Sequence, residues 1–321
     1  MNDLHEPKHI LFITSSRIGD AVLSTGLLDH IGRTVPGARV SIACGPLVTS
    51  LFEGYPFLEA LYPLKKQKRH GHWLNLWKKA AFRRWHSVID LRNSAVSRLI
   101  PAGQRFIYGS KIDSSRHKVE QAAQVMRLDY VPAPKLWFSE QQLKKAALLV
   151  PEGQPVLGVG PTANWRGKTW PVERFIEVVN WMTGPEGVMP NARVAVFSAP
   201  GEEEDACALF NSLVAERRLD LIAKTDPGSA AAALGRCSFY LGNDSGLMHC
   251  AAAAGISTLG LFGPSYPHLY RPWGEKSTYI STPESFDRLT DFEGYDVKTT
   301  GTLMGTLHVE AVKDKIIELL S

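Results

Sequence analysis

The sequence is poor in cysteine and lacks several short catalytic motifs. The four cysteines among 321 residues are Cys44, Cys207, Cys237 and Cys250, and none of them forms a CxxC pair. This argues against a zinc site or a dithiol redox motif, and it is typical of buried thiols in a reducing compartment. HExxH, GxSxG, GxGxxG and GxxxxGK[ST] are also absent, so metalloprotease, serine hydrolase, NAD-dependent oxidoreductase and P-loop readings lack their fingerprints.

Long apolar runs are missing as well. No run approaches the ~18 residues of a membrane span, and the start, MNDLHEPKHI, lacks the basic-then-apolar layout of a signal peptide. No repeat and no low-complexity tract interrupts the chain. A hydrophobic content of 44%, a charged content of 21% and a net charge of +4 are ordinary for a globular enzyme. We therefore expect a cytoplasmic protein with no nucleic-acid partner.

One region lacks acidic residues altogether. Residues 65–86 contain no Asp or Glu but eight cations, which are Lys65, Lys66, Lys68, Arg69, Lys78, Lys79, Arg83 and Arg84. Trp73, Trp77, Ala81 and Trp85 recur every four residues, which predicts that they share one helical face. Two interpretations stay open. The segment lies on an anionic membrane surface, or its tryptophans pack on their own domain while the cations are solvated.

Apolar strands alternate with helical patterns along the rest of the chain, which predicts an α/β protein with parallel sheets. The expected strands are 9–14, 39–43, 87–91, 106–108, 156–159, 194–198, 221–222, 239–241 and 258–262. The expected helices are 21–31, 171–182, 202–217, 229–234 and 309–320. The polar stretch 141–154 is the expected linker, so the domains are 1–148 and 149–321. Two such sheets facing one another would leave a cleft at their strand ends, where doubly wound folds bind ligands.

The stretch from Leu241 to Gly263 contains the most informative turn. Asn243, Asp244, Ser245 and Gly246 interrupt an apolar strand just before an Ala-rich helix. At the carboxyl end of a strand these groups and the free N–H groups of the helix face outward together, an arrangement that favours phosphate. The alternative is ordinary N-capping of the helix by Asp244 or Ser245.

Two more turns join a strand to a helix and contain candidate catalytic groups. Asp20 follows the first strand and is either a helix-stabilising first-turn acid or a general base. Lys168, in TANWRGKTWP, is either a surface lysine or a point charge for a departing diphosphate.

Three candidates on later helices complete the set. Glu202 and Glu203 open a helix and either stabilise its dipole or hold the hydroxyls of a ribose. His249, one turn beyond Ser245, either reaches a phosphate or packs internally.

Four blocks of the sequence resemble glycosyltransferase family 9, the heptosyltransferases that build the inner core of lipopolysaccharide. They are SSRIGDAVLSTGLL, KTWPVERF, APGEEE and GNDSGLMHCAAAAGISTLGLFGP, and they follow the order of the family over nearly the whole chain. The resemblance implies a GT-B fold of two Rossmann-like domains facing each other across a cleft. Residues 1–148 would bind the acceptor and residues 149–321 the donor. For the last helix, 309–320, we expect packing back on the N-terminal domain.

The resemblance also implies an activity and roles for single residues. It implies inverting, metal-independent transfer from ADP-heptose, with no cofactor, to a lipopolysaccharide-core or other anionic glycolipid acceptor. Asp20 resembles the catalytic base and Lys168 the lysine that neutralises the diphosphate, while the acid of the Glu202–Glu203 turn resembles the one on the ribose. The expected donor-binding residues are Thr162, Lys168, Glu202, Glu203, Asn243, Asp244, Ser245, Gly246 and His249.

A final set of residues is expected to bind the acceptor or the surface of the inner membrane, to which the protein would attach peripherally. Its members are Arg17, Lys65, Lys66, Lys78, Lys79, Arg83 and Arg84. Two alternatives remain for the function as a whole. One is a GT-B transferase that uses another nucleotide sugar, and the other is a non-catalytic nucleotide-binding protein associated with the membrane.

Overall fold

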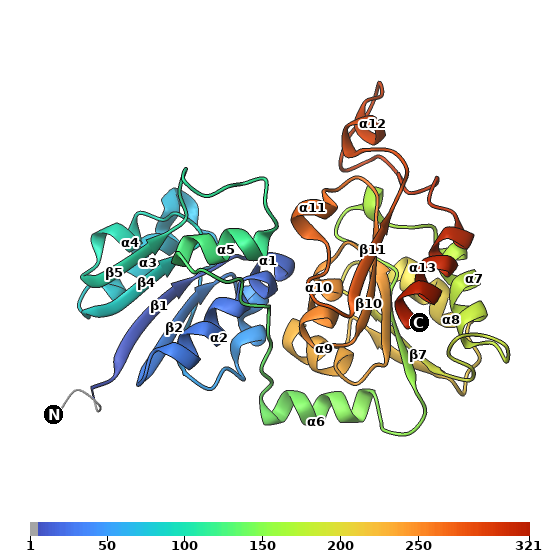
Figure 1. Cartoon of the computed structure of the whole chain (residues 1–321), viewed down its shortest axis with the longest axis horizontal. Coiled ribbons are helices and arrows are strands. Elements are labelled where there is room, and N and C mark those ends of the chain that lie inside the picture. Colours follow the sequence, from blue (N-terminus) through green and yellow to red (C-terminus); the bar gives the residue numbers. More distant parts are fainter. Residues whose placement is uncertain (1–5) are drawn as a thin grey trace. The chain divides into compact units, whose positions relative to one another are not determined.

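The chain divides after Glu140 into two compact units, each built on one parallel sheet (Figure 1). The computed structural model describes residues 6–321. The predicted α/β class with two parallel sheets is confirmed. The division comes earlier than the boundary expected after residue 148, because the segment 141–150 is attached to the second unit.

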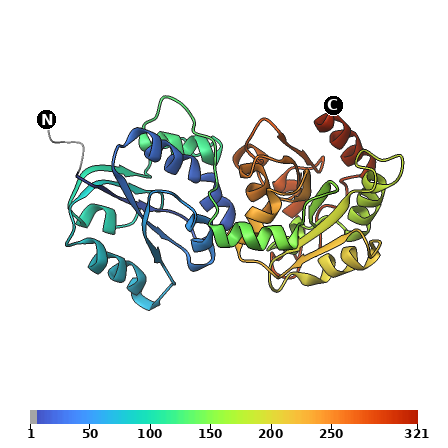
Figure 2. The ribbon, with the colours of Figure 1, turned by 90° about the horizontal axis from the view of Figure 1, so that it is seen from below.

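The first unit has a five-stranded sheet in the order β3-β2-β1-β4-β5, with helices on both faces (Figure 2). Its strands are β1 (Lys8–Ile13), β2 (Ala38–Cys44), β3 (Leu58–Pro63), β4 (Trp85–Asp90) and β5 (Ala102–Ile107). Its helices are α1 (Ile18–Leu23), α2 (Thr25–Thr34), η1 (Pro46–Phe52), η2 (Lys68–His70), α3 (Gly71–Ala80), α4 (Val96–Leu99) and α5 (Lys118–Met126). The strand order reverses between β1 and β4, which is where sheets of this kind bind ligands.

The helix expected at 21–31 is two helices, α1 and α2, which meet at Ser24. The Ser24 hydroxyl donates to the Ala21 carbonyl at 2.8 Å, and the Thr25 hydroxyl donates to the Val22 carbonyl at 2.7 Å. Hydroxyl groups that bond to nearby backbone compete with helical hydrogen bonds. Two of them in succession account for the break.

The prediction of one tryptophan face through Trp85 is wrong. Trp73 and Trp77 lie on α3 and pack, partly buried, against the core of the first unit. Trp85 lies in β4 beyond the end of the helix, fully buried, and its indole N–H donates to the Ala80 carbonyl at 2.9 Å. The packing interpretation therefore holds for the tryptophans themselves.

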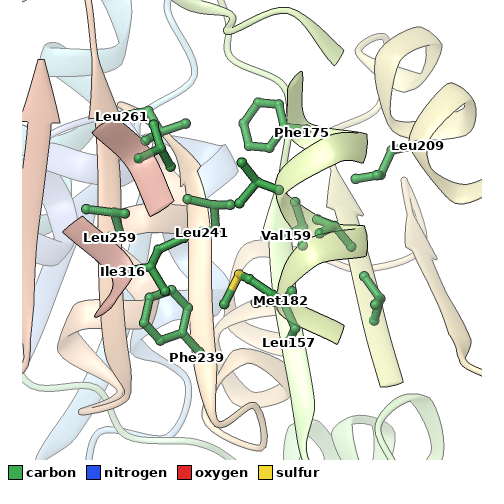
Figure 3. Packing of buried hydrophobic residues seen from close by; sticks show 14 of the residues in the cluster. Leu157, Val159, Phe175, Met182, Leu209, Phe239, Leu241, Leu259, Leu261 and Ile316 are labelled. Carbon is green, nitrogen blue, oxygen red and sulfur yellow. The ribbon is translucent and has the colours of Figure 1, made fainter. Parts of the chain in front are cut away.

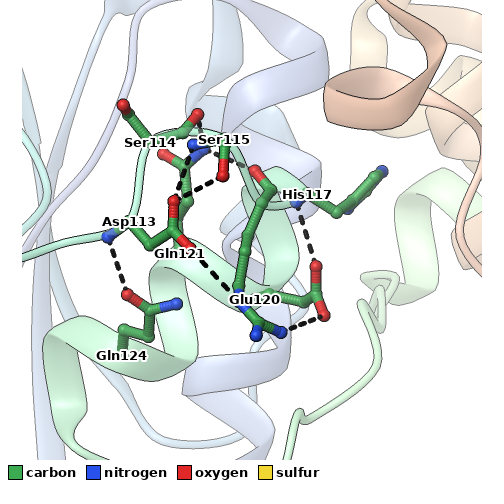
Figure 4. A network of polar contacts seen from close by, with 8 residues as sticks. Asp113, Ser114, Ser115, His117, Glu120, Gln121 and Gln124 are labelled. Atoms are coloured by element: carbon green, nitrogen blue, oxygen red, sulfur yellow. Dashed lines mark hydrogen bonds and ion pairs between the residues drawn. The ribbon is translucent and has the colours of Figure 1, made fainter.

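Helix α5 begins in a network of polar side chains (Figure 4). The Val119 N–H donates to the His117 ring at 3.2 Å, and the His117 N–H donates to the Glu120 carboxylate at 3.0 Å. This reciprocal pair is a capping box, which satisfies two backbone donors that the first turn of a helix leaves over. The Asp113 N–H donates to the Gln124 side chain at 2.9 Å and ties the preceding loop to the same helix.

The second unit has a six-stranded sheet in the order β11-β10-β9-β6-β7-β8. Its strands are β6 (Val156–Gly160), β7 (Arg193–Ser198), β8 (Arg218–Ile222), β9 (Phe239–Asn243), β10 (Ser257–Phe262) and β11 (Ser277–Ser281). Its helices are α6 (Glu140–Leu149), η3 (Arg166–Lys168), α7 (Val172–Thr183), α8 (Glu203–Ser212), α9 (Pro227–Leu234), α10 (Gly246–Ala253), α11 (Pro267–Tyr270), α12 (Phe286–Thr290) and α13 (Val309–Leu320). Here the order reverses between β6 and β9.

The sheet of the second unit is covered on both faces, α7, α8 and α13 lying on one and α9 and α10 on the other (Figure 1). Leu157, Leu241 and Leu259 from the strands meet Phe175 of α7 and Ile316 of α13 in one buried cluster (Figure 3). Burial of apolar side chains on both faces explains why these strands read as nearly continuous apolar runs. Because Ile316 is in this cluster, α13 belongs to the second unit.

Most of the stretch expected as a linker, residues 141–149, is instead ordered helix. Ala146 of α6 and the following Val150 are buried. The Arg236 side chain donates to the Val150 carbonyl at 2.6 Å, and Lys145 lies 3.8 Å from the Asp226 carboxylate. Both partners are in the second unit, so α6 is anchored there. Its polar sequence reflects one solvent-exposed face, not flexibility.

The helices are short. α7 and α13, the longest among residues 6–321, have 12 residues each, whereas a membrane-spanning helix needs about 20. No described helix combines the length and the apolar character needed to cross a bilayer.

Candidate functional site

Three neighbouring strands of the second unit end in polar turns. Residues 161–168 follow β6, residues 199–203 follow β7 and residues 244–246 follow β9. Since β6 lies between β7 and β9, and the carboxyl ends of parallel strands share an edge, the three turns meet at the point where strand order reverses. This is the expected place for a ligand in such a sheet.

Two predicted residues, distant in the sequence, form an ion pair at this edge. The Lys168 ammonium lies 2.5 Å from the Asp244 carboxylate. The Asp244 side chain is buried, with 7% of its surface exposed, whereas the Lys168 side chain keeps 23% exposed. The Asp244 carboxylate therefore holds the Lys168 ammonium in place, while part of the lysine side chain stays accessible to a ligand.

The start of α10 is not capped in the ordinary way. Ser245 occupies the N-cap position, but its side chain makes no cap hydrogen bond. Its hydroxyl has no hydrogen-bond partner among residues 6–321, and Ser245 and Gly246 are partly exposed. The N–H groups of the first turn thus remain available, and such groups attract anions. The capping alternative for this turn is not what the structure shows.

Two glycines are required beneath these turns. Gly160 and Gly242 are paired in β6 and β9, with the Tyr240 phenol against both. A Cβ atom at Gly160 would lie 2.1 Å from the phenol oxygen, and one at Gly242 would lie 2.4 Å from it. Larger residues would displace the strand ends from which Pro161 and Asn243 continue.

Asn243 and His249 are among the buried residues of the predicted site, as are Thr162 and Asp244. The Asn243 side-chain amide donates to the Pro161 carbonyl at 2.8 Å and accepts from the Trp170 N–H at 3.1 Å. Its polar atoms are thus engaged in holding both ends of the turn that contains Lys168. His249 is buried on α10, one turn after Ser245.

The two candidate ribose carboxylates differ in their partners. Glu203 accepts a hydrogen bond from the Gly201 N–H at 2.9 Å, which is a local helix-opening contact. Burial raises the pKa of the Glu202 carboxyl, an effect that the Thr162 hydroxyl opposes. Thr162 and Glu202 lie close enough for this without meeting in a well-formed hydrogen bond. Glu202 is therefore the acid of the two that is not engaged by backbone.

The sequence-based set missed the groups that brace the Lys168 turn. Arg166 forms an ion pair with Asp205, a buried acid in the first turn of α8. From the far end of the chain, the Leu303 N–H donates to the Gly167 carbonyl at 3.1 Å and the Leu307 carbonyl accepts from the Trp170 indole at 2.9 Å. The run of acids at the start of α8 was the one sequence feature that could have indicated Asp205. No local sequence feature indicated a role for residues 303–307.

Asp20 lies in the first turn of α1 in the first unit, after β1. The Ser15 hydroxyl donates to its carboxylate at 3.3 Å, and the same hydroxyl accepts from the Arg17 N–H at 3.1 Å. Asp20 is partly buried and the Arg17 side chain is exposed. The carboxylate is thus oriented by one long hydrogen bond and remains accessible.

A second turn, after β4, lies at the same edge of the first sheet and was also missed. The buried Asp90 accepts from the N–H groups of Arg92 and Ser94 at 2.8 and 2.7 Å. Arg92 is exposed and stacks over the Trp73 ring at 5.8 Å. The sequence feature that could have indicated this turn is the polar stretch after the apolar strand SVIDL.

The cations of the basic segment come from both ends of α3, but the Lys79 ammonium lies 5.3 Å from the centre of the Tyr62 ring of β3 and lines one pocket with Lys65. Lys65 and Lys66 follow β3, at the carboxyl edge of the sheet, while Lys78 and Lys79 lie in the last turn of α3. Arg84 is exposed in the turn before β4.

Arg83 departs from this pattern of exposed cations. It lies 2.7 Å from the Glu59 carboxylate and 5.5 Å from the centre of the Trp85 ring. It is therefore a paired charge within residues 6–321, unlike Lys78 and Arg84.

A family model matches most of the chain. The model of glycosyltransferase family 9 (heptosyltransferase) covers residues 73–295. This range contains both of the polar turns that form the Lys168–Asp244 ion pair.

Individual relatives match this chain over most of its length. The lipopolysaccharide heptosyltransferase 2 of Salmonella typhimurium is 26% identical over 315 residues, covering 84% of this chain and 87% of that protein. A family 9 glycosyltransferase structure from Veillonella parvula superposes with a TM-score of 0.80 at 19% identity, covering 99% of both chains. The structure of the E. coli ADP-heptose lipopolysaccharide heptosyltransferase II superposes with a TM-score of 0.72 at 21% identity, covering 97% of this chain and 98% of that one.

Proposed function

The chain belongs to glycosyltransferase family 9, the heptosyltransferases, and from this premise we propose the following reaction. The enzyme moves heptose from ADP-heptose to a hydroxyl group of a lipopolysaccharide inner-core or other anionic glycolipid acceptor, with inversion and without a metal ion. The observation that supports it most directly is the Lys168–Asp244 ion pair beside the uncapped start of α10. A cation and a set of free N–H groups at one point suit a diphosphate.

The donor would be held by its nucleotide diphosphate. Lys168 and the first N–H groups of α10 bind the phosphate oxygens, and Asp244 keeps the ammonium in place before the ligand arrives. Glu202, as a carboxylate, accepts hydrogen bonds from the ribose hydroxyls. Asn243 acts as a positioning residue, because both of its polar atoms are engaged by backbone.

The transfer itself needs a base and a stabilised leaving group. Asp20 takes the proton of the acceptor hydroxyl as that oxygen attacks the anomeric carbon, on the face opposite the diphosphate. The bond from the anomeric carbon to the phosphate oxygen breaks, and ADP leaves with the electron pair. Lys168 and the α10 N–H groups offset the charge that develops on ADP, where fixed electrostatic groups contribute most.

Nucleotide selectivity tests the proposal. We would titrate ADP, UDP, GDP and CDP into the full chain by calorimetry, in a buffer with a chelator. ADP is expected to bind at least tenfold more tightly than the other three nucleotides. Preference for another nucleotide would keep the transferase class and replace the donor, whereas no binding would favour a non-catalytic role. Activity assays with lipid A–Kdo acceptors follow from an ADP preference.

Replacing Lys168 tests the observation on which the proposal depends. We expect Lys168→Gln to weaken ADP binding by about 10- to 100-fold, since a charged hydrogen bond is worth about 1.5–3 kcal/mol. Adenosine, which lacks phosphate, should bind equally to both forms. Lys224→Gln is the matched control, because Lys224 is also a lysine paired with an aspartate, Asp220, in the same unit. Equal loss of ADP and adenosine binding would show that Lys168 is structural.

A further inference from the structure

Three large apolar side chains are exposed on the helices that cover one face of the first sheet. Phe82 exposes 91% of its surface, Leu99 exposes 67% and Leu74 exposes 53%. Single exposed apolar residues are common, but neighbouring ones point to an interaction site.

The elements that contain these residues are neighbours. α3 and α4 lie side by side (Figure 1). Leu74 lies on α3, and Phe82 lies in the turn that follows it. The Trp85 N–H donates to the Pro101 carbonyl at 2.9 Å. This bond joins the turn after α3, which contains Phe82, to the turn after α4, which follows Leu99.

Positive charge predominates around these residues, the Glu59 carboxylate being paired with Arg83. Residues 60–112 contain twelve Lys or Arg and a single acid, Asp90, and that acid is fully buried. Lys78 and Arg84 are exposed and make no ion pair with any residue in the range 6–321. Arg105 donates to the carbonyls of residues 97, 100 and 102 at the end of α4, so its charge also meets no acid. We call Leu74, Lys78, Phe82, Arg84, Leu99 and Arg105 the α3–α4 surface.

We propose that the α3–α4 surface docks the enzyme on an anionic lipid bilayer. Leu74, Phe82 and Leu99 enter the boundary between headgroups and acyl chains, and the three cations meet the lipid phosphates. Exposed aromatic and aliphatic side chains ringed by Lys and Arg are the composition that binds such interfaces. The cations make the surface complementary to anionic lipid and leave it ill-suited to self-association.

The docking surface is distinct from the cations near the carboxyl edge of the sheet. Lys78 lies seven residues after Gly71, the first residue of α3, so about 10 Å of helix separates Lys78 from the segment that includes Lys65 and Lys66. The two groups can therefore be altered separately. The proposal also does not depend on the donor assignment, because every residue of the α3–α4 surface lies in the first unit and the nucleotide site lies in the second.

Vesicle binding by the full chain measures the charge contribution. The vesicles are phosphatidylcholine with 0 or 30% phosphatidylglycerol, and binding is followed by co-sedimentation at about 0.1 M salt. We expect Lys78→Gln with Arg84→Gln to reduce partitioning to the anionic vesicles by about 25-fold, or about fivefold for each charge. The matched control, Lys65→Gln with Lys66→Gln, should change it less than twofold. Equal losses from both pairs would overturn the placement of the surface.

The apolar contribution is tested in the same assay. Phe82→Ser with Leu99→Ser should reduce binding at least tenfold, while Leu148→Ser with Val214→Ser, which alters two exposed apolar residues of the second unit, should leave it unchanged. ADP affinity should be the same in all four double variants. That comparison separates failure of the docking proposal from failure of the proposed function.

A fluorescent label at position 82 reports insertion into the bilayer directly, without depending on a loss of vesicle binding. Phe82→Cys, in a Cys207→Ser background that leaves the three buried cysteines in place, can be labelled with a polarity-sensitive dye. The emission should shift to the blue when anionic vesicles are added, and the same dye at Leu148→Cys should not respond. An unshifted dye at position 82 would overturn the proposal. A shift without lipid, together with a doubled mass in sedimentation, would assign the surface to a second copy of the chain and overturn it as well.

Discussion

Acidic side chains at the strand ends differ in the partners that they already have. Asp244 is paired with Lys168, and Asp205 with Arg166. Glu202 and Asp20 have no ion pair among the described residues, Asp20 accepting only a long hydrogen bond from Ser15. Acids that already form an ion pair hold the site together. Acids without an ion pair have oxygen lone pairs available to accept hydrogen bonds from a substrate. This difference selects Asp20 and Glu202 as the acids that would contact ligands.

Replacing Asp20 should separate catalysis from nucleotide binding. We expect Asp20→Asn to lower the transfer rate by about 10²- to 10⁴-fold, the usual contribution of a general base, with ADP affinity unchanged within twofold. Asp129→Asn, an exposed acid of the same unit, is the control and should retain full activity. A parallel loss of ADP binding and transfer in the Asp20 variant would make this residue structural. Transfer rates and calorimetry on both variants give the answer.

Nucleotide binding should depend on pH through Glu202. Burial raises the pKa of Glu202 above its ordinary 4.5, so the folded protein retains this proton to a higher pH than the unfolded chain. The carboxylate is the form that accepts hydrogen bonds from ribose. ADP affinity should therefore fall as the pH decreases through that raised pKa, and Glu202→Gln should flatten this part of the profile. An unchanged profile in the variant would remove Glu202 from the ribose site.

At the scale of elements, α13 is a structural part of the second core. Ile316 is fully buried in the cluster of Figure 3, while its neighbour Ile317 is 50% exposed. We expect Ile316→Ala to reduce the free energy of unfolding by about 2–5 kcal/mol, the cost of a large cavity in a core. Ile317→Ala is the matched control and should change it by less than about 0.5 kcal/mol. Denaturant titration of both variants measures the difference.

The strands that the sequence predicted best are those buried on both faces, whereas only the ends of the edge strands β5 and β8 were predicted, at 106–108 and 221–222. β1, β2, β4, β6, β7, β9 and β10 consist mainly of buried apolar residues, so their runs stand out. β3 and β11 are edge strands of partly exposed residues, such as LEALYP and STYIS, and give no such run. Helix ends were also displaced where a local bond decides them, as at Ser24. The position of a strand at a sheet edge and the single hydrogen bond that ends a helix arise only in the folded chain. The periodicity of apolar residues therefore does not predict them.

The candidate site was predictable wherever a turn and its neighbours contained the signal. Asp244, Ser245 and Lys168 lie in turns next to apolar runs, and the folded sheet brings these turns together. The internal use of the Asn243 amide and the Arg166–Asp205 pair depend on residues brought together from other strands. No spacing in the sequence reports such partners. The same limit applies to Trp85, whose four-residue spacing from Ala81 crosses a helix end.

At the scale of the whole molecule, the division at Glu140 predicts an independent nucleotide-binding unit. A fragment of residues 141–321 should fold and bind ADP within about threefold of the full chain, since it contains all the proposed donor groups. The shorter fragment 151–321 lacks α6 and the Val150 carbonyl that Arg236 contacts. It should melt at a lower temperature. Calorimetry and thermal unfolding of the two fragments test this, and equal stability would show that α6 is dispensable.

The strap formed by residues 302–307 has a consequence for biosynthesis. The Thr302 hydroxyl donates to the Thr169 carbonyl at 2.5 Å, and residues 303 and 307 bond to Gly167 and Trp170 on either side of Lys168. The strap follows β11 in the sequence, so the ribosome makes it after all six strands of the second sheet. A nascent chain that has not yet reached residue 307 therefore lacks a finished diphosphate site, and ADP should not assist its folding before the strap has been made.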